Sequence, residues 1–290
     1  MLKALRDLFK SKPEPAEGKL TLAEVLERDW FELFYQPKID LKTMRLVGAE
    51  ALVRARHPTR GVVSPGVFLP GASESDMLAL TERAIITVLR DWEVCAANGM
   101  SVKLSVNVPV SALVKLPIAT ILRDERPRAP NWPGLIMEVT EDEIVRDLKL
   151  ANAAAAELQA VRCSLALDDF GAGYSSLARL KQLPFSELKI DRAYVTNCHT
   201  DRVNAGLCEV FVELAKRFGL KTVAEGIELV HESHKLQALG CDVGQGYLYA
   251  KPMAKEQLIG IMRRRLVGAP PSVPMPAHRL SGLVPGLGKG

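Results

Sequence analysis

The sequence predicts an α/β fold in which parallel strands close into a barrel, and three observations lead to this fold class. Strand-like and helix-like segments alternate along most of the chain. The length of 290 residues suits a (β/α) barrel, because barrels of about 250 residues routinely form one domain. Each predicted strand also ends near a carboxylate, an amide or a lysine. A barrel gathers the ends of all its strands on one face, whereas a doubly wound sheet gathers only those near its switch point.

The first two predicted strands are separated by the short segment 40–45, which is typical of a hairpin, and strands and helices alternate regularly after them. The predicted strands are 32–39, 46–53, 102–107, 135–139, 164–168, 187–190, 222–224 and 243–249. The predicted helices are 76–98, 111–124, 147–161, 175–180, 202–218, 231–239 and 255–264.

Both ends of the chain depart from this alternation. We expect residues 1–19 to be a flexible segment, since their short amphipathic stretch, which could serve a membrane surface or a partner, is too short to be a stable helix alone. The barrel is expected over residues 20–265. Residues 266–290 are rich in proline and glycine and bury too little apolar surface to order themselves, so we expect a flexible tail. An unidentified protein partner could bind through these termini.

The composition narrows the function classes. Hydrophobic residues make up 48% and charged residues 25%, as in ordinary globular proteins. The net charge of +4 is small and is not gathered into one basic block, which argues against duplex nucleic acid as a partner. The five cysteines are scattered without a CxxC pair, and neither a membrane span nor a secretory signal is visible. We therefore expect a cytoplasmic protein.

The segment 163–177 carries the most informative local pattern. An apolar run predicts a buried strand that ends on Asp168 and Asp169 and then turns through two glycines. Adjacent carboxylates repel each other, so a cation held between them would make the pair tolerable. Taken alone, a helix-capping Asp beside a solvated Asp is the simpler interpretation.

Polar residues at the ends of the other strands favour the interpretation that this pair binds a cation. They are Glu50, Asn107, Glu138, Lys189, Glu225 and Gln245. Oxygen donors without histidine or cysteine suit Mg²⁺ or Mn²⁺ better than zinc. Such a set has the capacity for two ions about 3.5–4 Å apart, the usual arrangement for phosphodiester hydrolysis. Arg54 could clamp a phosphate. Taken singly, Asn107 could instead cap a helix and Lys189 could lie on the surface, while Glu141, Glu225 and Glu228 could be solvated loop acids.

The same residues lie within motifs that occur in a characteristic order. The motifs are Tyr35-Gln36-Pro37, Val47–Arg54 with Glu50-Ala51-Leu52 inside it, Asn107, Glu138–Glu141, Asp168–Leu177, Leu188–Arg192, Ala224–Glu228 and Gly244–Tyr247. Over about residues 20–265, this set resembles the EAL domain phosphodiesterases of bacterial cyclic di-GMP signalling.

The resemblance implies a modified TIM (β/α)8 barrel with an antiparallel first strand. It also implies a homodimer that hydrolyses cyclic di-GMP to linear pGpG with two Mg²⁺ or Mn²⁺ ions. By position, one ion would be held by Glu50, Asn107, Glu138 and Asp168, and the other by Asp168, Asp169 and Glu225. Lys189 would orient or deprotonate the attacking water, so the implied catalytic residues are Lys189, Glu50 and Glu225. The implied substrate contacts are Gln36, Leu52, Arg54 and Gln245, while Glu141 and Glu228 would steady the loop and its ligands.

Two features depart from the family pattern. Asn107 is followed by Val108-Pro109, where a serine is usual two residues after the asparagine. Proline removes a backbone donor, which makes Asn107 the least secure ligand. The segment 68–74 also differs from the usual acidic loop and could alter guanine contacts. The alternative function is a catalytically silent receptor that binds cyclic di-GMP and signals through protein contacts, although none of the expected carboxylates is missing.

Overall fold

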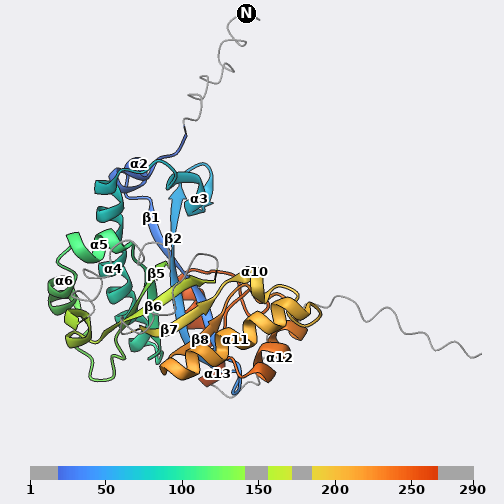
Figure 1. Ribbon diagram of the computed structural model, residues 1–290. Coiled ribbons are helices and arrows are strands. Elements are labelled where there is room, and N and C mark those ends of the chain that lie inside the picture. The colour runs from blue at the N-terminus through green and yellow to red at the C-terminus, as the bar shows by residue number, and fades with distance from the viewer. Residues whose placement is uncertain (1–18, 141–155, 172–184, 267–290) are drawn as a thin grey trace, which may run out of the picture.

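Eight strands form a closed ring in the computed structural model, which describes residues 19–140, 156–171 and 185–266 (Figure 1). The ring strands are β1 (Phe31–Asp40), β2 (Leu46–His57), β4 (Lys103–Asn107), β5 (Leu135–Thr140), β6 (Cys163–Phe170), β7 (Phe185–Ile190), β8 (Lys221–Ala224) and β9 (Val243–Gly244). A short ninth strand, β3 (Gly61–Val63), pairs with the far end of β2.

The first strand runs against both of its neighbours. β1 pairs with β2 from Phe31↔Ala55 to Ile39↔Leu46, and with β9 through Ile39↔Gly244 and Asp40↔Val243, in both cases antiparallel. The remaining neighbours in the ring pair in parallel. The structure therefore confirms the modified TIM barrel with an antiparallel first strand.

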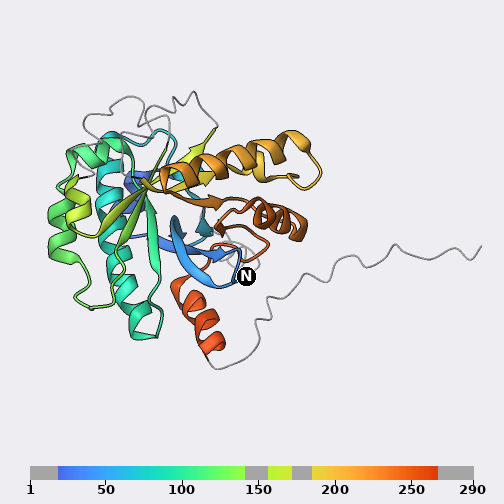
Figure 2. The same ribbon diagram turned by 60° about the horizontal axis from the view of Figure 1, so that its bottom comes forward.

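Helices surround the ring, as Figure 2 shows. The longer ones are α4 (Glu74–Ala97), α5 (Val110–Lys115), α6 (Ile118–Glu125), α11 (Arg202–Phe218), α12 (Val230–Leu239) and α13 (Lys255–Leu266). α4 begins where Ser73 Oγ accepts a hydrogen bond from the Asp76 amide, and it buries Ile85, Val88 and Trp92 at helical spacing. This apolar face packs on the strands, because Ile85, Val88 and Trp92 belong to the same buried cluster as Leu104 and Val106 of β4.

The strand expected over 46–53 continues to His57, and two other predicted elements differ more from the structure. The single helix expected over 111–124 is two helices, α5 and α6, because Pro117 lies between them and lacks the amide that would continue the first helix. The strand expected over 243–249 ends at Gly244. A Cβ at Gly246 would lie 2.1 Å from the Ile227 carbonyl oxygen, so the two segments approach too closely for Gly246 to be replaced. The Tyr249 and Ala250 amides then donate to the Gly246 carbonyl in a turn.

Some predicted elements lie outside the described residues. These are the helix 175–180 and most of the helix 147–161, of which residues 156–160 are described and helical. The sequence pattern did not reveal α2 (Leu22–Glu27), α3 (Pro65–Phe68), α10 (Arg192–Val195) or β3, since elements this short show little periodicity.

Candidate active site

Lys189 lies at the centre of a carboxylate cluster at the carboxyl ends of the parallel strands. Its side chain is 1% exposed, and Nζ lies 2.5 Å from Glu138 Oε2, 2.7 Å from Glu225 Oε1, 3.0 Å from Asp168 Oδ1 and 3.9 Å from Glu50 Oε2. These acids come from β2, β5, β6 and the residue after β8. The barrel thus brings together residues as much as 175 positions apart, as the sequence pattern predicted.

A second set of contacts holds Glu50 in place. Asn107 Nδ2 donates to Glu50 Oε1 at 2.8 Å, and Gln245 Nε2 donates to Glu50 Oε2 at 2.5 Å and to Gln36 Oε1 at 3.1 Å. Asn107 ends β4, and the Val108 amide donates to the Glu138 carbonyl. Pro109 comes next and is the N-cap residue of α5. Pro109 therefore removes no hydrogen bond between β4 and β5, and the Asn107 side chain reaches the cluster.

A backbone irregularity turns both adjacent aspartates toward the site. Neighbouring residues of a regular strand point to opposite faces. The pairing of β6 with β7 shifts register between Leu167 and Phe170, and Asp169 has φ of 54°, a left-handed conformation that Asp tolerates better than most residues. Ligand atoms of Asp168, Asp169 and Glu225 consequently lie within 4.8 Å of one another. Asp168 is buried and Asp169 is exposed, and the helix 175–180 that such a pair could cap lies outside the described residues.

The electrostatics show how crowded this cluster is. Burial raises the pKa of Glu225 to about 8, with Lys189 opposing and Asp168 adding to the shift. Burial and the neighbouring Glu138 also raise the pKa of Glu50. Burial alone would lower the pKa of Lys189, but Glu138, Glu225 and Glu50 raise it well above its usual value. Near neutral pH, one lysine therefore does not fully compensate the acids around it.

The donor set fits a hard divalent cation. Every candidate ligand offers oxygen. Two buried oxygens in the cluster, Glu225 Oε1 and Gln245 Oε1, accept no hydrogen bond among the described residues, although Lys189 Nζ lies 2.7 Å from the former without hydrogen-bond geometry. Counted as ionised, the five carboxylates outnumber the Lys189 ammonium, so the cluster has negative charge that divalent cations would offset.

The sequence interpretation missed Lys38. This β1 residue is 3% exposed, and its ammonium lies 2.7 Å from Glu138 Oε1 and 3.3 Å from Glu187 Oε2. Burial alone would lower the pKa of Lys38, but Glu138 and Glu187 raise it above its usual range. A signal was present in the sequence, because a lysine inside the apolar strand 32–39 must either reach solvent or find a buried acid.

Three other predicted site residues, Leu52, Arg54 and Glu228, are also described. Leu52 and Arg54 share a face of β2 with Glu50 by strand alternation, and the Arg54 guanidinium lies over the Phe34 ring and donates to the Val53 carbonyl. Glu228 is exposed and pairs with Arg192 at 2.6 Å. Glu141 and residues 172–177 of the predicted loop lie outside the described residues.

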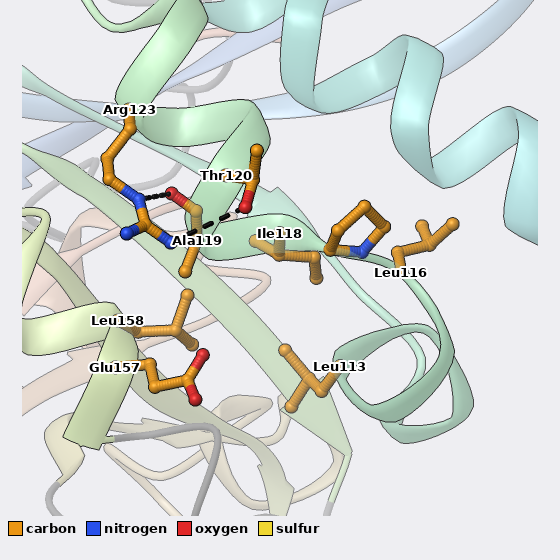
Figure 3. A pocket seen from close by; sticks show the side chains of 9 residues that line it. Leu113, Leu116, Ile118, Ala119, Thr120, Arg123, Glu157 and Leu158 are labelled. Atoms are coloured by element: carbon orange, nitrogen blue, oxygen red, sulfur yellow. Dashed lines mark hydrogen bonds between the residues drawn. The ribbon is translucent and has the colours of Figure 1, made fainter.

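A pocket elsewhere on the barrel is separate from this cluster. Figure 3 shows it between α5, α6 and residues 156–160, where the Arg123 guanidinium donates to the Ala119 carbonyl at 3.0 Å. It shares no residue with the carboxylate cluster.

Within the described ranges, no helix combines the length and apolar character needed to cross a bilayer.

The closed ring and its acidic centre define a TIM-barrel protein with its polar site at the carboxyl ends of the strands, where barrel enzymes carry out chemistry. A family model described as the EAL domain matches residues 19–252. The chain belongs to the EAL domain family.

Individual relatives agree with this assignment. The chain is 35% identical over 241 residues to the bifunctional diguanylate cyclase/cyclic di-GMP phosphodiesterase MucR of Pseudomonas aeruginosa, covering 82% of this chain and 35% of MucR. It is 34% identical over 238 residues to the cyclic di-GMP phosphodiesterase RocR of the same organism, covering 81% of this chain and 60% of RocR. The chain therefore matches about a third to three fifths of these relatives' length.

Solved structures show the same fold. The MucR phosphodiesterase in its c-di-GMP complex superposes with a TM-score of 0.75 at 35% identity, covering 82% of this chain and 97% of that one. The EAL domain of Mycobacterium smegmatis DcpA gives a TM-score of 0.68 at 29% identity, covering 81% and 98%.

Proposed function

We propose that this protein is a metal-dependent phosphodiesterase that hydrolyses cyclic di-GMP to linear pGpG. The observation that carries the proposal is the convergence of four carboxylates on the buried Lys189 ammonium at the catalytic end of the barrel. The names of MucR and RocR, and the c-di-GMP complex of MucR, supply the substrate. The acid count supports two Mg²⁺ or Mn²⁺ ions rather than one.

The residues divide into ligands and supports. Glu50, Asn107, Glu138 and Asp168 would hold one ion, and Asp168, Asp169 and Glu225 the other, with Asp168 bridging. When bound, such ions lower the pKa of a coordinated water and polarise the phosphoryl oxygens. Gln245 and Asn107 keep the Glu50 carboxylate in one orientation through the bonds described above. Gln36, Leu52, Arg54 and Gln245 are the proposed substrate contacts.

Lys189 has two roles in this proposal. In the structure its ammonium neutralises part of the acid cluster. With dications in place, Lys189 would leave some of these oxygens and face the attacking water. As an ammonium, it would orient this water by donating a hydrogen bond. As a neutral amine, which burial and nearby positive charge both favour, it would accept the water's proton at Nζ.

The experiment is product analysis with purified protein, cyclic di-GMP and Mg²⁺ or Mn²⁺, followed by chromatography for pGpG. We expect pGpG to accumulate with metal and to stop when EDTA is added. Nucleotide binding without pGpG, across both metals and a range of concentrations, would refute the enzyme and support the silent receptor.

The homodimer remains a proposal and has its own test. α11 exposes Val203 and Val210, 69% and 59% accessible, on one side of the helix. We take these two exposed apolar side chains as the contact between the two copies. A double V203E/V210E variant would place charge in that contact and should shift the sedimentation coefficient toward that of a monomer. A parent protein that is monomeric at all concentrations would remove the dimer from the proposal.

A further inference from the structure

The inside of the barrel contains two layers of polar residues rather than one. In the β1–β2 register Gln36 lies opposite Glu50, and Lys38 lies opposite Gly48, two residues further from the mouth. On β7, Glu187 precedes Lys189 by the same two residues. Lys38 and Glu187, joined at 3.3 Å, therefore lie directly below the layer that contains Glu50 and Lys189.

Glu138 connects the two layers through its two carboxylate oxygens. Oε1 accepts from Lys38 Nζ in the lower layer at 2.7 Å, and Oε2 accepts from Lys189 Nζ in the upper layer at 2.5 Å. The Glu138 side chain is completely buried, so these two lysines determine how its carboxylate group is turned. Oε2 is therefore the oxygen that contacts Lys189, the centre of the cluster in which the cations are proposed to bind.

The stem of the lysine that reaches Glu138 lies beside Gly48 of the neighbouring strand. A Cβ at Gly48 would lie 3.6 Å from Lys38 Cδ and 3.0 Å from the Lys103 carbonyl oxygen. The stem of Lys38 thus runs against a strand position without a side chain. Because Lys38 and Glu138 are about a hundred positions apart, the contact forms only when β1 and β5 face each other across the closed ring.

We propose that Lys38 is a positioning residue that occupies one oxygen of Glu138 and restricts this carboxylate to a single ligand oxygen, Oε2. The inference rests on the proposed two-metal function. The Lys38 ammonium orients Glu138 and also repels cations, so its removal should affect turnover and metal binding differently. Turnover should fall because Glu138 can turn. Metal binding should stay as strong or become stronger because the repulsion is lost.

The main alternative is that Lys38 serves to neutralise Glu187, a carboxylate whose side chain is 13% exposed. Three variants of the full chain distinguish the two roles: Lys38→Met, Glu187→Gln, and the double variant. The double variant removes the buried pair together and avoids an unpaired acid, so it remains informative if Lys38→Met alone does not fold.

The measurements are kcat for cyclic di-GMP at saturating Mn²⁺, and Mn²⁺ titration of nucleotide-free protein followed by electron paramagnetic resonance. We expect Lys38→Met and the double variant to lose about 10–100-fold in kcat, the usual effect of losing a ligand's hydrogen-bond partner. Their half-saturating Mn²⁺ concentration should not rise, and their Mn²⁺ spectrum should change. Glu187→Gln should stay within about twofold of the parent, since the direct Lys38–Glu138 contact remains.

Two results would overturn the inference. If the double variant regains the parent kcat, Lys38 serves only to balance Glu187. If Lys38→Met keeps the parent kcat, Glu138 needs no such restraint. A parent that makes no pGpG contradicts the proposed function instead. In that case the Mn²⁺ spectrum decides the positioning role, and a spectrum that Lys38→Met leaves unchanged refutes it.

Discussion

Replacing Lys189 by methionine should separate the charge balance of the site from its chemistry. The ammonium contacts Glu138, Asp168 and Glu225 within 3.0 Å, and methionine leaves these acids without that cation. Removing one partner of a buried ion pair typically costs about 3–5 kcal/mol. A loss of about 3 kcal/mol lowers the Tm of a domain of this size by about 6–12 °C.

Divalent cations should reverse this loss, because they supply the positive charge that the variant lacks. A ligand present at a hundred times its Kd stabilises the folded state by about 2.7 kcal/mol. The parent has to displace an ammonium to bind the same ions, so Mg²⁺ or Mn²⁺ should raise the Tm of Lys189→Met by more than that of the parent. Hydrolysis of cyclic di-GMP should nevertheless collapse, while metal-dependent nucleotide binding survives.

The assay is a thermal melt followed by circular dichroism, with EDTA and then with a metal titration. Lys115→Met is the matched control, because Lys115 pairs with Glu74 on the surface, where both side chains are about half exposed. Its Tm should change little with or without metal. Equal metal-induced shifts in Lys189→Met and the parent would refute the idea that Lys189 and the cations share the same oxygens, and undiminished turnover would remove Lys189 from the chemistry.

Three further predictions concern other parts of the site. Glu50→Ala should raise the half-saturating Mn²⁺ concentration, because it removes a ligand oxygen; an unchanged Mn²⁺ titration would contradict the assignment. The folded protein binds the Glu225 proton more tightly than the unfolded chain, so the resulting stability is present below about pH 4.5 and is lost as the pH rises through about 8. The metal-free Tm should therefore fall across this range, and Glu225→Gln should flatten that fall. Gly171→Ala should lower both Tm and turnover, because φ is +94° and its Cβ would lie 2.7 Å from the Phe211 ring, whereas Gly206→Ala, in open space on α11, should stabilise the helix by about 1 kcal/mol.

The sequence predicted the barrel well because its signal is repeated. Seven of the predicted strands, all but the first, end near a carboxylate, an amide or a lysine, and a closed ring is the arrangement that brings these ends together. The helix 202–218 matched α11 at both ends, since Asp201 supplies a side-chain cap and Gly219 ends the helix in the left-handed conformation. These are local signals that do not depend on distant residues.

One error had a local cause, because Pro117 divides the helix expected over 111–124, and the others arose where distant segments determine the local structure. The short length of β9 reflects the close packing of Gly246 on Ile227, which no local pattern contains. The candidate ligand Asp169 was predicted, but its left-handed backbone conformation was not. The contact of Lys38 with Glu138 was also hidden, because strand alternation identifies an inward lysine but not which acid across the ring it will reach.

The antiparallel first strand has a consequence for how the protein is made. β1 is synthesised early but has to wait for β9, its second neighbour, and Gln36 bonds to Gln245 across a separation of 209 residues. At about 5–20 residues per second, the ribosome needs about 10–40 s to cover that distance. During that interval one edge of β1 has no partner strand, and Glu50 lacks the amide that Gln245 later donates. The acid cluster is therefore completed in the same event that closes the ring, so the proposed hydrolysis, measured during synthesis, would report barrel closure directly.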